Sequence, residues 1–489
     1  MRSRRQFPAP QAIALAEDEL SRFGSAARHV YNLLAKIHRP FITSIKTGTR
    51  KAQSSAGRPL NLRNEQALKS DQLVETVTRS PTARLVPLKV AAYKTLWRIQ
   101  RMIGALIRSL PGAWSLLDLP TGRIRSLRFW IERRRKATDW WTRPMGPYFE
   151  SILPSQRVAR TRPKSVVETR IHPLINIELD RVHNETFLAR IPRARILGPT
   201  GVVITPDGQI VEESTWGAKW LNQDRAVTSW KLPRCENRSG IFYTICSYSH
   251  EGYYHWMSEV LPRLMARDEL TIDTMIIVPA NLSRWQSESL SLMGITSDQT
   301  ISLDREYLDL ETLYFPSYVG EPGNPHARAI EWLRAKLLPA GAGEAKTRRR
   351  LYITRRLAAR RRVVNEDELA PILNDYGFEI IEAENLTVKE QIDLFSQAEA
   401  VVSLHGAGLT NMIFADSGCK VLEIYDPEHL FVHYYALADV MKHDYWYLIG
   451  QPAGATAAHG ATGHQDIRIS PDDFARSLDA MFERQEISI

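Results

Sequence analysis

The sequence has 489 residues, of which 44% are hydrophobic and 24% are charged; this is typical of a soluble protein with about two or three domains. Its net charge of +9 is unevenly spread, since residues 1–170 hold 33 basic and 11 acidic side chains and residues 171–489 hold 31 and 44. No apolar run reaches the roughly 18 residues that span a bilayer, and three cysteines are too few for a disulfide framework or a clustered zinc site.

Residues 1–165 predict a basic, partly disordered N-terminal extension. Its opening apolar stretch is short and meets the acidic run Glu17, Asp18 and Glu19, so we do not expect a signal peptide. Residues 40–90 are rich in Ser, Thr, Arg and Lys and contain few aromatic residues. This composition predicts weak or no order there.

Between residues 91 and 119, one narrow helical face carries five apolar residues: Leu96, Ile99, Ile103, Leu106 and Leu110. Arginines lie on the opposite side, so this helix can rest on an anionic membrane surface or pack on its own protein with arginines in solvent. The run from Arg128 to Trp141 interleaves basic residues with tryptophans and favours membrane association. Such a mixture also suits nucleic acid, but no recognised motif accompanies it, and no nucleic-acid partner is expected.

Residues 166–335 predict a mixed α/β domain. Short strands with turn signals at hairpin spacing occur in ARILGPTGVVITPDGQIVEES, and a helical segment follows at Tyr253–Met265. After residue 335 comes a stretch rich in Pro, Gly and Ala, which predicts a hinge between this domain and the next.

Residues 345–489 predict a second α/β domain with a parallel sheet. Four strands alternate with three helices, and the strands are LYIT, FEIIEA, AVVSL and KVLEIY. Two helix starts have the spacing of a capping box, Asn365 with Glu368 and Thr387 with Glu390. Short loops between alternating strands and helices indicate a parallel sheet covered on both faces.

Three features fall where ligands bind in such sheets, beyond the carboxyl ends of the strands. The turn His405–Gly408, HGAG, joins a strand to a short helix, and its glycines allow close backbone approach to an anion at the helix start. Arg355 and Arg356 follow the strand LYIT directly. Glu423 lies 18 residues after His405, on a neighbouring strand, where a carboxylate can accept hydrogen bonds from a ribose.

Together these features predict a site for a nucleotide diphosphate, although each alone has an ordinary structural explanation. The turn is not G-x-G-x-x-G, which argues against a dehydrogenase, and no G-K-[ST] follows it as in a P-loop.

A second group of polar residues lies in the first α/β domain. His255, Glu259 and Arg263 are spaced four residues apart and share one face of an α-helix. A His–Glu pair can act as a base with its orienting carboxylate, while Glu–Arg pairing on a polar helix face explains the same spacing. Nearby aromatic residues predict a platform for a sugar ring: Tyr248, Tyr253, Tyr254 and Trp256. We find no third ligand at a spacing that would suit zinc.

These motifs resemble glycosyltransferase family 61, formerly the domain DUF563, over about residues 195–430. The matching stretches are GYYHWMSEVLPRL, YITRRLAARRRVVNEDEL and EQIDLFSQAEAVVSLHGAGLTNMIFADSGCKVLEIY. The resemblance implies a GT-B fold, in which two Rossmann-like domains face a cleft, and inversion at the transferred sugar. It places His255 and Glu259 on the acceptor side, one of them as the base. The implied donor-site residues are Arg355, Arg356, His405, Gly406, Ala407, Gly408, Leu409, Thr410, Asn411 and Glu423.

The predicted protein is therefore an inverting hexosyl- or pentosyltransferase that uses a nucleotide-sugar donor and a glycan or glycolipid acceptor of a capsule or other surface polysaccharide. We expect no metal or other cofactor, because an Arg and a helix N-terminus can stabilise the leaving phosphate and no D-x-D triad occurs. The expected location is cytoplasmic and peripheral on the inner face of the membrane. The alternative is a non-catalytic, degenerate transferase fold docked to membrane or nucleic acid through its basic N-terminal third.

Overall fold

The computed structural model describes residues 102–109, 118–135, 146–168, 170–229, 231–338, 348–428, 430–453 and 465–483. The chain divides into two compact units, Met1–Leu117 and Asp118–Ile489. Within the first unit the described residues include a helix over 102–108. The region 40–90, most of the predicted apolar helical face, and Trp140 and Trp141 lie outside the described residues. Across the described ranges, no helix is both long enough and apolar enough to cross a membrane.

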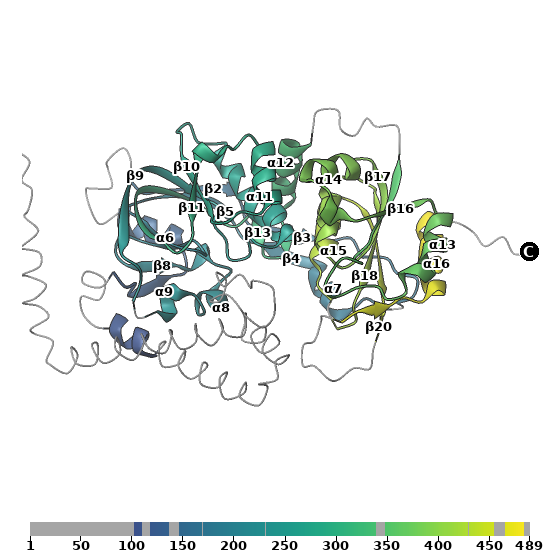
Figure 1. The fold of residues 1–489 in the computed structure, drawn as a ribbon. Helices are drawn as coiled ribbons and strands as arrows, with labels where there is room; N and C mark the ends of the chain where they lie inside the picture. Colours follow the sequence, from purple (N-terminus) through teal and green to yellow (C-terminus); the bar gives the residue numbers. More distant parts are fainter. Residues whose placement is uncertain are drawn as a thin grey trace, which may run out of the picture. The chain divides into compact units, whose positions relative to one another are not determined.

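The unit Asp118–Ile489 contains two large sheets, one mixed and one parallel (Figure 1). Eight strands of the ten-stranded mixed sheet follow the order β1 (Gly122–Ile124), β8 (Gln209–Val211), β7 (Val202–Ile204), β6 (Arg195–Leu197), β12 (Tyr307–Pro316), β9 (Cys235–Thr244), β10 (Met275–Pro279) and β11 (Thr300–Leu303). Strand β5 (Thr186–Pro192) also pairs with β12, and β2 (Tyr148–Leu153) pairs with β5. Strands β12, β9, β10 and β11 are parallel, whereas β6, β7 and β8 form the antiparallel hairpins expected from the turn signals.

Part of the predicted extension belongs to this mixed sheet. Strands β1 and β2 lie within residues 1–165, and helix α6 (Leu127–Arg135) packs on the same core. Trp130 on α6 is only 7% exposed, and its Nε1 donates to Asp207 Oδ1 at 3.2 Å. Trp130 belongs to the run that was predicted to associate with a membrane, but its side chain is part of the protein core.

The second sheet has five parallel strands in the order β16 (Phe378–Ile381), β15 (Arg349–Ile353), β17 (Ala398–Leu404), β18 (Lys420–Tyr425) and β19 (Asp444–Ile449). Four of these are the predicted strands, and β19 was not predicted. Because β16 and β17 flank β15 on opposite sides, the strand order reverses between β15 and β17. In open parallel sheets, ligands bind beyond the carboxyl ends of the strands at such a point.

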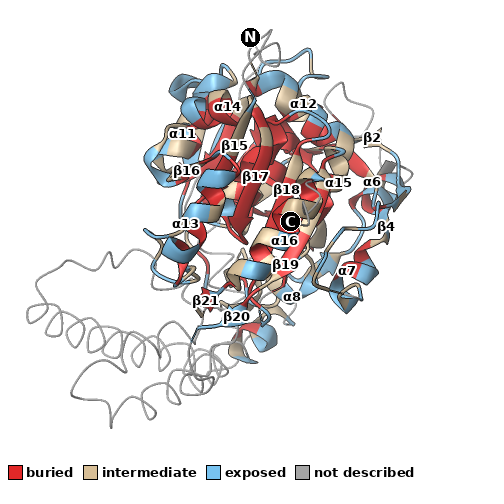
Figure 2. Cartoon of the chain, turned by 90° about the vertical axis from the view of Figure 1, so that its right-hand side faces the viewer, coloured by how far each residue is buried: buried red, intermediate tan, exposed pale blue. Residues whose placement is uncertain are grey.

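Helices cover both faces of the parallel sheet, as the sequence predicts. Leu351, Val401 and Val421 point towards α14 (Val388–Phe395), η9 (Ala407–Phe414) and α15 (His433–Val440). The residues that follow each of them, Tyr352, Val402 and Leu422, point the other way, towards α13 (Glu366–Asp375) and α16 (Pro471–Phe482). Figure 2 shows these strands buried between helices with exposed outer surfaces. Successive side chains of a strand point to opposite faces of the sheet. Because both faces are buried here, successive residues of these strands are apolar.

One of the two predicted capping boxes is confirmed. Thr387 and Glu390 exchange hydrogen bonds at the start of α14, with Thr387 N donating to Glu390 Oε2 at 2.7 Å and Glu390 N to Thr387 Oγ1 at 3.2 Å. At the second start, Asn365 is the N-cap residue of α13 as predicted, but its side chain makes no cap bond, so the predicted capping box does not form. Its amide instead donates to Ile469 O at 2.8 Å and to Glu368 Oε2 at 3.0 Å. The contact with Ile469, which is 104 residues away in the chain, engages the side chain in place of a cap bond.

Shorter elements connect these parts: β3 (Gln156–Ala159), α7 (Pro173–Glu178), β4 (Asp180–His183), α8 (Ala218–Leu221), α9 (Arg225–Thr228), α11 (Arg284–Leu292), β13 (Gly320–Glu321), β14 (Asn324–Pro325), α12 (Ala327–Leu337), β20 (Gln451–Pro452) and β21 (Ile467–Arg468). Strands β13 and β14 form a tight hairpin over residues 320–325, and this hairpin contributes to the candidate site.

Candidate functional site

The helical segment predicted at Tyr253–Met265 has three different helical geometries in succession. An α-helical turn at Tyr253–His255 is followed by a π-helical turn at Trp256–Val260 and by a 3-10 helix at Leu261–Arg267. Pro262 lies in the first turn of the last piece, where its missing N–H costs no helical hydrogen bond. π-helical turns are rare and frequently occur at functional sites.

This irregular helix brings His255 and Glu259 together. Their Nδ1 and Oε1 atoms lie 3.0 Å apart, in ion-pair range but outside the alignment of a hydrogen bond. Glu259 Oε1 also accepts a hydrogen bond from the N–H of Gly323 in the β13–β14 hairpin, at 2.8 Å. The side chain of Glu259 is 3% exposed and that of His255 is 23% exposed. Solvent therefore reaches the histidine, while the carboxylate lies buried behind it.

The change in helix type takes Arg263 away from this pair. Its guanidinium is buried and donates to Cys246 O at 2.7 Å and to Pro316 O at 2.8 Å. The prediction that Arg263 shares a face with His255 and Glu259 is wrong, because it assumed regular α-helical spacing across the π-helical turn. Arg263 instead ties the helix to the ends of two strands of the mixed sheet.

A second histidine–carboxylate pair lies at the end of the parallel sheet. His405 Nδ1 and Glu423 Oε1 are 2.5 Å apart, and Glu423 Oε2 accepts hydrogen bonds from Tyr425 at 2.9 Å and Tyr445 at 2.6 Å. Glu423 is fully buried, and its two oxygens are occupied by protein groups. This geometry supports a role in holding His405 better than contact with a ribose.

Burial sets the protonation of this second pair. It raises the pKa of Glu423 to about 8, although the two tyrosine hydrogen bonds act in the opposite direction. Burial lowers the pKa of His405 to about 3, and the positive charges of Arg361 and Arg355 lower it further. Near neutral pH the proton therefore lies on Glu423, which donates to Nδ1, and the neutral imidazole carries its own proton on Nε2.

Arg355 reaches the same place from the end of β15. A Cβ added to Gly406 would lie 2.1 Å from Arg355 Nη1, so the absence of a side chain at Gly406 makes room for the guanidinium. Arg355 Nε donates to Arg361 O at 3.0 Å, which anchors the side chain in the turn that follows β15. Burial lowers the pKa of both Arg355 and Arg361, and each cation contributes to the repulsion that keeps His405 neutral. From the sequence, Arg361 was one arginine of a basic tract and was not predicted to belong to the site.

The other predicted donor-site residues have different surroundings. Arg356 is half exposed and pairs with Glu366 at 3.2 Å. Asn411 is buried, accepts from the Tyr253 hydroxyl at 2.7 Å and donates to Gln391 at 2.6 Å. Leu409 and Thr410 are buried, Ala407 is exposed, and a Cβ on Gly408 would lie 3.0 Å from Ile353. Within the HGAG turn, His405 and Gly406 are buried, Ala407 is exposed and Gly408 is partly buried.

His433, at the start of α15, lies between the two histidine–carboxylate pairs. Its ring centroid is 6.0 Å from that of His255 and 6.5 Å from that of His405. The ring of Tyr254 stacks on it at 5.1 Å with an interplanar angle of 17°. Sequence reasoning missed His433, because nothing in the run HYYALADV distinguishes its histidine from an ordinary helical residue. Residues 150 positions apart, His255 and His405, thus flank a single ring.

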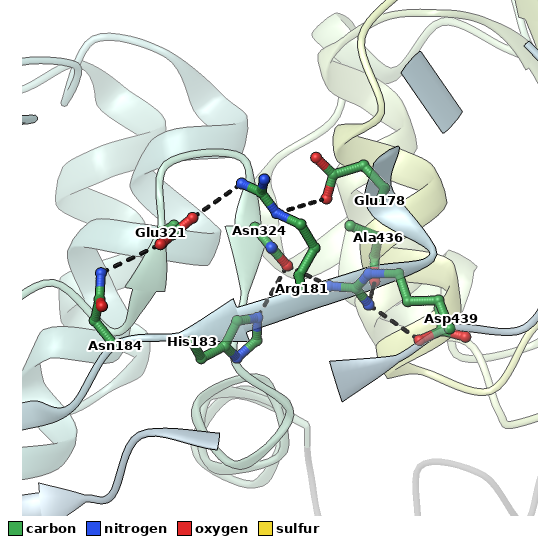
Figure 3. A network of polar contacts seen from close by, with 9 residues as sticks. Glu178, Arg181, His183, Asn184, Glu321, Asn324, Ala436 and Asp439 are labelled. Atoms are coloured by element: carbon green, nitrogen blue, oxygen red, sulfur yellow. Dashed lines mark hydrogen bonds and ion pairs between the residues drawn. The ribbon is translucent and has the colours of Figure 1, made fainter. Parts of the chain in front are cut away.

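A buried polar network holds the β13–β14 hairpin against α15 (Figure 3). Arg160, whose side chain is fully buried, donates to Asn324 Oδ1, to Ala436 O at 3.3 Å and to Asp439 Oδ2 at 3.0 Å. Asn324 Oδ1 also contacts His183 Nε2 at 3.0 Å. Because Gly323 binds Glu259 and α15 carries His433, this network supports both halves of the site.

Within the described ranges, no group of three or more His, Cys, Asp and Glu side chains is arranged to hold a metal ion. Positive charge in the site comes from Arg355 and Arg361.

Comparison with known proteins assigns part of the chain to a family. A family model described as Glycosyltransferase 61 matches residues 253–422, a segment that begins just before His255 and runs through Arg355 and the HGAG turn. The chain contains a glycosyltransferase family 61 domain. The family expected from the sequence is thereby confirmed. Glu423 and His433 lie outside the matched segment.

Two rice proteins show distant similarity to this chain. This chain is 24% identical over 227 residues to beta-1,2-xylosyltransferase XYXT1 of Oryza sativa subsp. japonica. The alignment covers 41% of this chain and 48% of the relative. The chain is 22% identical over 219 residues to beta-1,2-xylosyltransferase XAX1 of the same organism, covering 39% and 38%. The chain thus spans about half or less of the length of the curated relatives it matches.

Proposed function

We propose that the protein is an inverting glycosyltransferase that transfers a sugar from a nucleotide-sugar donor to a glycan or glycolipid acceptor. The observation that carries this proposal is the placement of a partly exposed histidine–carboxylate pair, His255 and Glu259, and a cationic strand end, Arg355 with His405, on either side of His433. Inversion needs one base and one stabilised leaving group, and the two halves supply one each.

The donor half holds the diphosphate in this proposal. Arg355, Arg361 and the Nε2–H of neutral His405 are hydrogen-bond donors that converge at the end of β17, where η9 also begins. Breaking the bond between the anomeric carbon and the phosphate oxygen leaves the electron pair on that oxygen. Cations and donors already in place stabilise this new charge without having to reorganise. The strand order reverses here as well, which suits a nucleotide site.

The acceptor half supplies the base. His255 is the exposed member of its pair and Glu259 the buried one, so we assign His255 as the base and Glu259 as the carboxylate that orients it. His255 Nε2 takes the proton from an acceptor hydroxyl as its oxygen bonds to the anomeric carbon on the face opposite the leaving phosphate. A small rotation of the imidazole would complete the hydrogen bond to Glu259, and such contacts often tighten only when substrate is bound.

The proposal extends to the setting of the reaction. We place the two sheets in a GT-B-like arrangement, the acceptor in capsule or other surface polysaccharide synthesis, and the protein peripherally on the cytoplasmic face of a membrane. The excess of basic residues in 1–170 supports membrane association. Because both relatives are named as beta-1,2-xylosyltransferases, a xylosyl donor is the first to try.

The test is a panel of sugar nucleotides, UDP-xylose first, incubated with the full chain. We expect one nucleotide class to raise the melting temperature and to support transfer to an oligosaccharide acceptor. His255→Ala should lower kcat by about 100-fold or more while leaving the donor-dependent shift intact, and Arg355→Ala should weaken that shift. Stabilisation by no donor, or full turnover in His255→Ala, would overturn the proposal and favour a non-catalytic module.

A further inference from the structure

Three aromatic side chains extend from the candidate base along the protein surface. The ring of Trp216 lies 4.7 Å from that of His255, edge to face, and the ring of Trp220 lies 5.7 Å from Trp216. Tyr248 continues the row, at 4.9 Å from Trp220. We call Trp216, Trp220 and Tyr248 the aromatic row. All three side chains are partly exposed rather than buried.

The local structure explains why two tryptophans stand next to each other there. Gly217, between Trp216 and helix α8, has φ +98, a backbone conformation that favours glycine. Across this turn the rings of Trp216 and Trp220 meet edge to face, while Leu221 is fully buried. Ser214 Oγ accepts from Val203 N at 3.0 Å, which fixes the start of the segment to the mixed sheet.

One polar atom in the aromatic row lacks a partner. The indole Nε1 of Trp216 is enclosed and makes no hydrogen bond with any residue in the described ranges. Buried indole N–H groups normally find an acceptor, since leaving one unpaired costs free energy. A ligand hydroxyl beside the base would supply that acceptor once the side chains that enclose Nε1 move aside.

We propose that the aromatic row is the acceptor subsite and that it binds a sugar ring by stacking. This inference rests on the proposed function and deepens it by naming the class of acceptor. An acceptor hydroxyl must reach His255, so the surface that adjoins His255 must hold the rest of the acceptor. Sugar rings present C–H groups on one face, which the electron-rich face of an indole attracts, and hydroxyls at the edge, which suit the Nε1–H of Trp216.

The row also differs from the predicted sugar platform. Of the four aromatic residues named from the sequence, only Tyr248 belongs to it, while Tyr254 and Trp256 are buried in the core. Trp216 and Trp220 come from a segment outside the matched residues 253–422. The part of the site that selects the acceptor thus lies outside the part that defines the family, which is where differences in specificity are expected.

The experiment measures transfer kinetics in Trp220→Ala and Trp216→Phe, with Trp332→Phe as the matched control. Trp220 lies beyond Trp216 in the row as seen from His255, so its loss should raise the acceptor KM at least about tenfold, which corresponds to about 1.4 kcal/mol. The donor KM, and kcat at saturating acceptor, should stay within about twofold of wild type. Trp216→Phe keeps a ring but removes the N–H, and should raise the acceptor KM by a smaller factor. Trp332, on α12, is bound to Asp268 and should leave all constants unchanged.

A direct binding arm separates this inference from the proposed function. Xylohexaose, cellohexaose and mannohexaose are titrated into the full chain, and tryptophan fluorescence is followed for wild type and Trp220→Ala. Binding that Trp220→Ala abolishes supports the subsite even if no donor is turned over, in which case only the proposed function fails. Unchanged acceptor KM in both variants, or wild-type binding that survives in Trp220→Ala, overturns the subsite even if transfer is observed.

Discussion

Gly406 and Arg355 share one small space at the ends of β17 and β15. Because an added Cβ would lie 2.1 Å from Arg355 Nη1, Gly406→Ala should push the guanidinium out of the donor half. Arg355 has a flexible side chain, so we expect little loss of stability but a donor affinity lowered by about tenfold or more, the size of a lost charge-assisted hydrogen bond. The donor-dependent rise in melting temperature measures this.

Gly418→Ala is the matched control for that substitution. Gly418 has φ +84 and open space where its Cβ would stand. Alanine there should cost about 1 kcal/mol of stability through backbone strain and leave donor affinity as it is. Equal donor affinity in Gly406→Ala and wild type would show that Arg355 does not hold the donor.

Glu423 predicts a pH dependence of stability. Its pKa is raised from 4.5 in the unfolded chain to about 8 in the folded protein, so the native state binds the extra proton between these values. Its contribution is complete below pH 4.5 and is lost as the pH rises towards 8, at up to about 1.4 kcal/mol per pH unit. His405 has an unfolded pKa of 6.5 and a folded pKa near 3, so above pH 6.5 the unfolded chain still loses up to about half a proton from it, which raises stability with pH and acts against the Glu423 contribution.

The measurement is denaturant unfolding of wild type and Glu423→Gln between pH 6.5 and 8. The difference in stability between the two should shrink as pH rises, because glutamine keeps a similar shape and does not titrate. A constant difference across this range would mean that Glu423 is ionised in the folded protein and that His405 carries the balancing charge.

At the scale of elements, the position of the β13–β14 hairpin depends on Arg160. This guanidinium binds the hairpin through Asn324 and helix α15 through Ala436 and Asp439. Removing it leaves buried acceptors unpaired, so Arg160→Ala should cost about 3 kcal/mol of stability. It should also lower activity, because Gly323 in the same hairpin binds Glu259.

Arg157→Ala is the control at this scale. Arg157 also pairs with an aspartate, Asp180, but both side chains are exposed to solvent. Exposed ion pairs contribute little, so the unfolding midpoint should stay near that of wild type. Similar midpoints for Arg160→Ala and Arg157→Ala would contradict the structural role of the network.

The type of helix around His255 decides which side chains reach the candidate site. Regular α-helical spacing from the sequence put His255, Glu259 and Arg263 on one face. The π-helical turn at Trp256–Val260 and the 3-10 helix after it kept the first pair in contact and sent Arg263 into the core. Local spacing alone does not reveal such a turn, because it is stabilised by tertiary contacts such as those of Arg263 with Cys246 and Pro316.

At the scale of the whole molecule, charge separates the first third from the rest. Residues 1–170 carry a large excess of basic side chains, and residues 171–489 an excess of acidic ones. We expect the full chain to sediment with phosphatidylserine-containing vesicles at about 0.05 M salt and to be released at about 0.5 M, as screening shortens the reach of the charges.

Neutral phosphatidylcholine vesicles and duplex DNA are the comparisons for this experiment. Weak binding to neutral vesicles and a preference for anionic vesicles over DNA are expected. Tighter, salt-dependent binding to DNA would favour a nucleic-acid partner for the basic third, and binding that salt does not change would show that charge is not the cause.

The sequence by itself determined the parallel sheet, the α14 capping box, the HGAG turn and the family. Each of these depends on residues close together in the chain: two-residue alternation, Thr387 followed by Glu390, and glycines that directly follow a strand. The protonation of the His405–Glu423 pair, the place of His433 between two histidines, the burial of Trp130 and Arg263, and the aromatic row were decided only by the tertiary structure. Burial and long-range contact set each of them, and neither is encoded in the spacing of neighbouring residues.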